Sequence, residues 1–167
     1  MAQATQRRRS PASRLKTSKS RASRPLWRCP ACGRRFANRN QSHFCGNYDL
    51  KSHFGRKPKE VARLYEMFVD RVRRCGPVII MPEKTRIAFQ VRMSFAAVRI
   101  QRSRIAGHLV LAERNDRPCF VQIDSISRRN HVHHFRIEKP ADLDEQFCRF
   151  IRMAYAVGQQ KHLRANA

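Results

Sequence analysis

The chain has 167 residues, 36 Lys and Arg side chains against 12 Asp and Glu, and a formal net charge of +24. This length admits one compact core with a small module at one end and excludes two full domains, while the charge predicts a polyanionic partner. No apolar run is long enough to cross a membrane and no apolar signal segment is present, so we expect a cytoplasmic protein without membrane contact.

Residues 1–25 form a basic arm. Residues 1–48 contain 12 basic side chains and no acidic one, so half of the net charge lies in the first third of the chain. The arm itself is mostly Arg, Ser, Ala, Thr and Lys, which cannot bury enough apolar surface to offset the entropy of ordering. We expect it to be disordered, with Arg7, Arg8 and Arg9 available to phosphate groups.

Residues 26–48 contain a metal-binding pattern. Cys29 and Cys32 have the two-residue spacing at which two thiolates bind one ion, and Gly33, directly after Cys32, suits the left-handed position of such a turn. Cys45 would be the third ligand and His43 the fourth, with His53 as the alternative fourth ligand. Three thiolates with no nearby acidic residue predict a structural Zn²⁺ site, because a catalytic site keeps an open position and usually a carboxylate base.

The same module offers basic and aromatic side chains around the ion. The expected phosphate contacts are the three arginines between the second and third cysteines, Arg34, Arg35 and Arg39. We expect the aromatic side chains to pack around the ion as a small core, and these are Trp27, Phe36 and Phe44.

Residues 58–160 predict one α+β domain. A helix opens at Pro58, carries apolar residues at helical spacing and ends near Gly76. About five short strands with period-two alternation follow, separated by polar turns, which predicts an antiparallel sheet. A final helix is expected to begin with Asp142 as its N-cap and Glu145 as the capping partner. The two helices would cover one face of the sheet.

The cysteine module and several later motifs resemble an uncharacterised bacterial family, a domain of unknown function sometimes labelled a predicted transport protein. The motifs are Trp27-x-Cys29-Pro30-x-Cys32-Gly33-x-x-Phe36, Asn40-Gln41-x-His43-x-Cys45, Gly76-Pro77-Val78, Lys84-Thr85-x-Ile87-Ala88-Phe89, Met93-x-Phe95-Ala96 and Ala154-Tyr155-x-x-Gly158. The resemblance covers residues 26 to 160 and implies an α+β domain preceded by a zinc knuckle with His43 as a ligand. It implies no established reaction, and a transport role does not suit a chain without a membrane span.

Three other groups of residues could carry chemistry. His131, His133 and His134 lie on one predicted strand, the first two on one face and the third on the other. Basic residues on the middle strands, among them Lys84, Arg86, Arg99 and Arg104, would form a phosphate groove if they share a face, whereas Phe89 and Phe95 belong in the core. The acids Glu113, Asp116 and Asp124 would have to meet in space to form a nuclease-like cluster.

The sequence favours a non-enzymatic zinc-containing protein that binds nucleic acid, DNA or RNA, through phosphate with weak sequence preference. No recognised catalytic arrangement is present. One alternative is a module that binds a small anionic ligand or a protein partner on the basic sheet. A second is a metal-dependent hydrolase or nuclease that uses the three acids.

Overall fold

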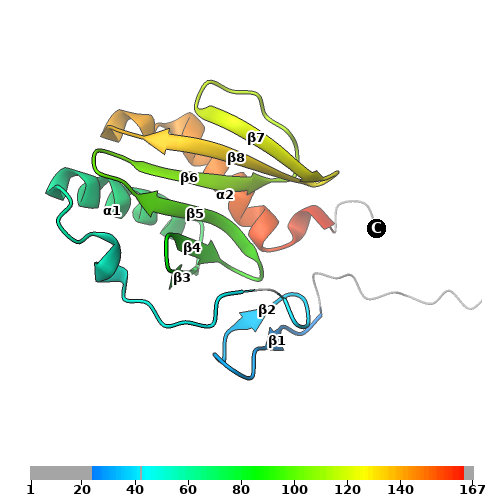
Figure 1. The fold of residues 1–167 in the computed structure, drawn as a ribbon. Coiled ribbons are helices and arrows are strands. Elements are labelled where there is room, and N and C mark those ends of the chain that lie inside the picture. The colour runs from blue at the N-terminus through cyan, green and yellow to red at the C-terminus, as the bar shows by residue number, and fades with distance from the viewer. Residues whose placement is uncertain (1–23, 42, 164–167) are drawn as a thin grey trace, which may run out of the picture.

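A computed structural model describes residues 24–41 and 43–163 of the protein (Figure 1). It contains two α-helices, a six-stranded antiparallel sheet and a separate two-stranded sheet near the N-terminus, which confirms the predicted α+β class. Arg7, Arg8 and Arg9, the phosphate contacts predicted on the arm, lie outside the described residues. Within the described part of the chain, no helix has both the length and the apolar composition needed to cross a bilayer.

The large sheet has six strands where about five were predicted. Its strands are β3 (Ile79–Pro82), β4 (Ile87–Gln90), β5 (Ser94–Ile100), β6 (Ile105–Leu111), β7 (Phe120–Ser127) and β8 (Asn130–Ile137). Every neighbouring pair is antiparallel, in the order β3-β4-β5-β6-β8-β7. Short polar turns between successive strands lead to this pairing, because antiparallel neighbours need no crossover connection.

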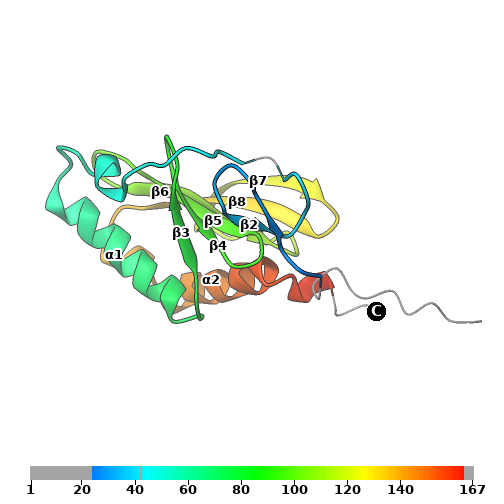
Figure 2. The ribbon, with the colours of Figure 1, turned by 90° about the horizontal axis from the view of Figure 1, so that it is seen from below.

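Both helices pack on the same face of this sheet (Figure 2). Helix α1 (Lys59–Arg73) and helix α2 (Glu145–Gly158) each bury one apolar stripe. Phe68 of α1 lies between Phe89 and Phe135, with ring centroids 5.3 and 5.7 Å away. Phe89 and Phe95 are fully buried as expected, so neither can act as a stacking surface for a base. Neither α1 nor α2 covers the opposite face of the sheet.

Helix α2 begins later than the sequence suggested. Asp144 is its N-cap, and the Asp144 Oδ1 accepts a hydrogen bond from the Phe147 N–H at 2.7 Å. Asp142 instead ends the 3₁₀ turn Pro140–Asp142, where its Oδ2 accepts from the backbone N–H groups of Glu138 and Lys139. The prediction of Asp142 as the cap was wrong, because the 3₁₀ turn uses that carboxylate first.

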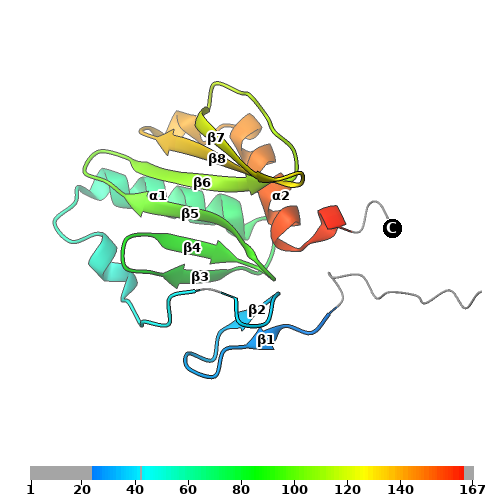
Figure 3. The ribbon, with the colours of Figure 1, turned by 45° about the vertical axis from the view of Figure 1, so that its right-hand side comes forward.

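The N-terminal module is a hairpin of β1 (Trp27–Arg28) and β2 (Arg35–Phe36), followed by a linker with a 3₁₀ turn at Leu50–His53. Figures 2 and 3 show that it lies beside β3 and β4, on the side of the sheet away from the helices. Gln90, which is 2% exposed, donates from Nε2 to the Arg35 carbonyl oxygen at 2.6 Å. The chain ends, within the described part, in a 3₁₀ turn at Lys161–Leu163.

Candidate metal centre and basic sheet face

A tight turn between β1 and β2 positions the first two cysteines. The Cys29 N–H donates to the Arg34 carbonyl oxygen at 2.8 Å, and the Gly33 N–H donates to the Cys29 carbonyl oxygen at 2.9 Å. Gly33 has a φ of 71°, in the left-handed region where a side chain would be strained. The turn therefore places Cys29 and Cys32 side by side, as their spacing predicted.

Cys29, Cys32, His43 and Cys45 form one cluster in which the four ligand atoms all lie within 4.8 Å of one another. The Cys29 and Cys45 sulfurs are 3.8 Å apart, and His43 Nε2 is 3.3 Å from the Cys32 sulfur and 3.2 Å from the Cys45 sulfur. A tetrahedral site with metal–sulfur bonds of about 2.3 Å needs sulfurs about 3.8 Å apart. The four side chains could hold a metal ion, and His53 is not a member of this cluster.

The orientation of His43 suits a metal ligand. Its Nδ1 lies 2.7 Å from the Gln41 carbonyl oxygen, and since a carbonyl only accepts, Nδ1 carries the proton. The Nε2 lone pair then points toward the sulfurs, which is how metal-bound histidines are held in proteins. Phe36 is 3% exposed and packs on the His43 ring at a centroid distance of 4.1 Å. Trp27 lies 6.1 Å from the Phe36 ring.

The thiols differ in how readily they lose their protons. Hydrogen bonding to the backbone at Cys32 lowers the pKa of the Cys29 thiol to about 6, which favours the thiolate. Burial and the neighbouring sulfurs raise the pKa of the Cys45 thiol to about 11, because a second negative charge beside Cys29 is unfavourable. A cation bound among the sulfurs would remove that repulsion and favour three thiolates.

The other residues predicted in this module have different surroundings. Arg34 donates from its guanidinium to the carbonyl oxygens of Phe44 and Gly46, at 2.9 and 3.1 Å, and so helps to close the loop that carries Cys45. Arg35 and Arg39 have exposed side chains. Phe44 does not pack around the cluster as expected, because its ring is 46% exposed and lies against Tyr48 at 5.1 Å.

A second feature is a groove on the face of the sheet that the helices leave uncovered. Its volume is about 600 Å³, and side chains from β5, β6, β7, β8 and the β3–β4 turn line it. Four of the lining residues are arginines and one is acidic, namely Arg86, Arg99, Arg104, Arg136 and Asp124. Of the basic residues named from the sequence, Arg86, Arg99 and Arg104 thus line one face, which was the condition for a phosphate groove, whereas Lys84 does not line it.

Two of these arginines have acidic partners and two do not. Arg86 pairs with Glu83 at 2.6 Å, and Arg104 pairs with Glu138 at 2.7 Å. Arg99 and Arg136 are exposed and form no ion pair with any other described residue. These two guanidinium groups are the ones most available to an anion.

The floor of the groove carries two histidines and an aspartate. His108 on β6 lies directly opposite His134 on β8, and their ring centroids are 5.9 Å apart. The His134 Nε2 is 2.8 Å from the Asp124 Oδ2. Burial, together with Arg86, His134 and Arg99, lowers the pKa of His108 to about 4. His108 and Arg136 were not among the residues predicted from the sequence, although the alternation along β6 and β8 could have placed both on one face.

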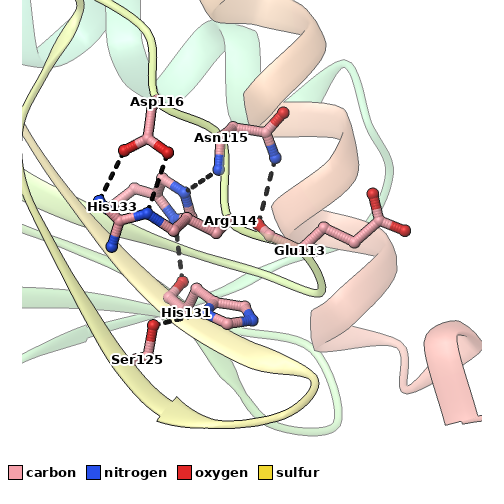
Figure 4. A network of polar contacts seen from close by, with 7 residues as sticks. All are labelled: Glu113, Arg114, Asn115, Asp116, Ser125, His131 and His133. Atoms are coloured by element: carbon pink, nitrogen blue, oxygen red, sulfur yellow. Dashed lines mark hydrogen bonds and ion pairs between the residues drawn. The ribbon is translucent and has the colours of Figure 1, made fainter.

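His133 has a structural role on the opposite face, as the alternation along the strand predicted (Figure 4). It is fully buried and its Nε2 accepts from the Asn115 N–H at 2.9 Å, while its Nδ1 donates to the His131 carbonyl oxygen at 3.0 Å. Both ring nitrogens are satisfied in the neutral form. His131 instead shares a hydrogen bond of 2.8 Å with the Ser125 hydroxyl. Burial lowers the pKa of His133.

The three acids of the predicted nuclease-like cluster have separate partners. Asp116 forms an ion pair with Arg114 at 2.6 Å, and Asp124 forms its own with His134. Glu113 contributes its carbonyl oxygen to the Asn115 side chain (Figure 4). In residues 24–41 and 43–163, the cysteine–histidine cluster is the one group of potential metal ligands that lies close together.

Residues 50–158 match the family described as Domain of unknown function (DUF5655). The chain belongs to this family. The match supports the resemblance to an uncharacterised family, and the family description states no function. No curated protein and no solved structure matches the chain.

The matched DUF5655 residues include the whole sheet, both helices and every side chain that lines the basic groove. Cys29, Cys32, His43 and Cys45 all precede the match. The cysteine–histidine cluster therefore lies outside the matched DUF5655 region, to which the linker and hydrogen bonds from Gln90 and Arg92 connect its module.

Proposed function

We propose that this protein binds nucleic acid through phosphate contacts, with a structural Zn²⁺ ion in the N-terminal knuckle. Zn²⁺ suits three thiolates and one imidazole because it accepts soft ligands in tetrahedral geometry without redox chemistry. The ion would fix residues 27–45 as a rigid unit. The knuckle then presents Arg35 and Arg39 from a fixed backbone, next to the arm that carries Arg7, Arg8 and Arg9.

The observation that carries the proposal is the excess of arginine over acid in the groove on the uncovered sheet face. A concave surface of one charge sign attracts a polyanion, and planar guanidinium groups match phosphate oxygens. A second groove, of about 400 Å³, lies between the knuckle and β3–β4 and shares Arg86 with the first. Exposed Phe44 lines it and offers a ring on which a base could stack.

The contacts that the two grooves offer favour a flexible strand. Groove residues that contact phosphates and stack one base on an aromatic ring favour a nucleic acid with an extended backbone. Such contacts carry little information about base identity. We therefore propose single-stranded nucleic acid as the preferred form, with weak sequence preference and a steep dependence on salt concentration.

The test is binding of a labelled single-stranded oligonucleotide at several salt concentrations, by fluorescence anisotropy. The double variant Arg99→Ser/Arg136→Ser removes the two groove arginines without acidic partners. The matched control Arg63→Ser/Arg149→Ser removes the same charge from exposed positions on α1 and α2. Loss of two phosphate contacts should reduce the slope of log K against log salt by about 1.4, at about 0.7 for each contact.

If the groove variant and the helix variant lose oligonucleotide affinity to the same extent, net charge alone drives binding and the proposal is overturned. Cys29→Ser and a protein lacking residues 1–25 separate the other contributions. If the arm accounts for all of the affinity, the groove has another ligand. Retained affinity without the arm, together with loss in the groove variant, supports the proposal.

The alternative is that the sheet face binds a small anionic molecule. A volume of about 600 Å³ is within the range of small-ligand sites. Competition separates the two possibilities, since a mononucleotide that displaces the oligonucleotide at micromolar concentration favours the small ligand. Under the nucleic-acid proposal, affinity rises with oligonucleotide length.

A further inference from the structure

A row of three titratable side chains crosses the floor of the basic groove, from β6 through β8 to β7. His108 and His134 are cross-strand partners with ring centroids 5.9 Å apart, and Asp124 holds the Nε2 of His134 at 2.8 Å. These side chains face away from the helices and from the apolar core. The fold does not need them for packing, so their joint placement beneath the arginines calls for a chemical explanation.

The spacing of the two imidazoles matches one phosphodiester group. A phosphate oxygen accepts hydrogen bonds at about 2.8 Å, so two rings about 6 Å apart can contact different oxygens of the same phosphate. The His108 ring forms no hydrogen bond with another described residue, which leaves its nitrogens for a ligand. His134 has its Nε2 engaged by Asp124, which orients the ring and leaves its Nδ1.

We propose that His108 and His134 form an acid–base pair that cleaves single-stranded RNA by attack of the 2′-hydroxyl on the adjacent phosphate. This proposal rests on the binding function proposed above and adds an activity to it, in place of the non-enzymatic role expected from the sequence. It needs no metal ion and no co-reactant, because the nucleophile belongs to the substrate.

The step can be written with all atoms accounted for. Neutral His108 takes the proton from the 2′-hydroxyl, and the 2′ oxygen forms a bond to phosphorus. The bond from phosphorus to the 5′ oxygen of the next nucleotide breaks, and protonated His134 donates its proton to that oxygen. The products are a 2′,3′-cyclic phosphate and a free 5′-hydroxyl, with one proton moved from one imidazole to the other overall.

The surroundings of each group fit its role. Asp124 accepts the Nε2–H of His134 at 2.8 Å, which orients the ring and leaves Nδ1 as the nitrogen that donates to the leaving oxygen. Arg99 and Arg136 lie in the same groove and can neutralise the charge that develops on the phosphate oxygens.

The charged neighbours of His108 keep its ring in the neutral form, which is the form that accepts a proton. Arg86 from the β3–β4 turn, Arg99 from β5 and His134 from β8 face it, and with burial they lower its pKa to about 4. His108 is therefore neutral at pH 7 and able to accept a proton, and cleavage should decline as the pH falls toward 4. Asp124, Arg104 and Arg136 complete the set of charged groups in the groove.

The experiment follows cleavage of a labelled single-stranded RNA in Mg²⁺-free buffer by the full-length protein and by His108→Asn, His134→Asn and Asp124→Asn. His131→Asn is the matched control, since His131 is on the same strand but its ring bonds to Ser125. Each histidine variant should lose cleavage by about 100-fold or more, as expected for loss of a general acid or base. The product should carry a cyclic phosphate, and the DNA of the same sequence should stay intact.

Binding is measured separately on 2′-O-methyl RNA, which lacks the nucleophile and cannot be cleaved by this route. Binding without cleavage overturns the inference and leaves the proposed function in place. If the protein neither binds nor cleaves RNA, the proposed function and the inference are both overturned. Cleavage that persists in the histidine variants comes from a contaminating ribonuclease and also overturns it. If His108→Asn fails to fold, His134→Asn still decides, because that side chain is 35% exposed and its loss leaves the core intact.

Discussion

Single residues in this protein have roles that depend on which face of a strand they occupy. His133 and His134 are neighbours in the chain, yet one is fully buried and the other lines the basic groove. Adjacent residues of a strand point to opposite faces, so replacing either histidine affects a different face of the sheet. Replacement of His133 removes the acceptor for the Asn115 N–H, whereas replacement of His134 changes the groove alone.

The first prediction concerns the stability of the protein in acid. Burial lowers the pKa of His108 from 6.5 to about 4, so the unfolded chain binds a proton at a higher pH than the folded protein does. Between pH 6.5 and pH 4 the free energy of unfolding should therefore fall by about 3 kcal/mol through this group alone, and above pH 6.5 the effect is absent. Chemical denaturation at pH 7, 5.5 and 4 measures it.

His108→Asn is the comparison for that prediction. It should lack this part of the acid sensitivity, because the amide does not titrate, and metal loss or carboxylate protonation affects both proteins equally. Parallel curves of unfolding free energy against pH for the two proteins would contradict the prediction.

The second prediction concerns Phe44 as a stacking surface. Since 46% of the residue is exposed, Phe44→Ala should leave the melting temperature nearly unchanged. Affinity for a single-stranded oligonucleotide should decrease by roughly 1 to 3 kcal/mol, the usual contribution of one stacked base. The control is Ile126→Ala, which removes a 71% exposed apolar side chain on β7. Equal affinities for Phe44→Ala and the unchanged protein would exclude a stacking role.

Among the elements, the knuckle and the six-stranded domain depend on different sources of stability. The knuckle has two strands of two residues each and two buried apolar residues, Cys29 and Phe36. So small a core cannot offset the entropy of ordering more than twenty residues, and we expect the proposed metal ion to supply the difference. The domain has a continuous core between sheet and helices that contains no metal ligand.

The third prediction is that metal removal unfolds the knuckle alone. A zinc chelator should release one Zn²⁺ per chain and remove hydrogen-exchange protection from residues 27–45, while β5, β6 and β8 stay protected. Cys29→Ser should produce the same pattern without chelator. Cys119→Ser is the control, because Cys119 lies outside the cluster. Protection that survives complete chelation would show that the knuckle folds without an ion.

At the scale of the whole molecule, the two faces of the sheet have different uses. The helices cover one face completely enough to bury Phe68, Phe89, Phe95 and Phe135. The other face is covered by the knuckle at β3 and β4 and is left as a basic groove over β5 to β8. An antiparallel sheet can present one face to solvent without loss of its backbone hydrogen bonds, which is what makes this division possible.

The fourth prediction follows from this arrangement. A protein consisting of residues 49–163 should fold cooperatively, with a melting temperature within a few degrees of the chelated full-length protein. Among the contacts it loses are two hydrogen bonds, from Gln90 to the Arg35 carbonyl oxygen and from Arg92 to the Arg24 carbonyl oxygen, at about 1 kcal/mol each. A shorter version, residues 58–163, should be less stable, because Leu50 and Phe54 pack against the core. A fragment 49–163 that fails to melt cooperatively would show that the knuckle is part of the fold.

Much of the fold could be predicted from local pattern. The helical spacing of apolar residues after Pro58 located α1, and period-two alternation located the strands. The start of α2 could not be predicted, because Asp142 and Asp144 both have carboxylates that can cap, and the 3₁₀ turn decides between them. The predicted count of about five strands was one short of six, and two of the six, β3 and β4, have only four residues each and so give little periodicity.

The members of the cysteine–histidine cluster could be predicted from the sequence, whereas the set of residues that lines the groove could not. The three cysteines and His43 lie within 17 residues, so chain connectivity alone keeps them close, and the sequence by itself determined that they could meet. Arg86, Arg99, Arg136 and His108 are separated by up to 50 positions, and only the order and register of the strands placed them on one face. Long-range pairing depends on the packing of the whole core, which no local pattern contains.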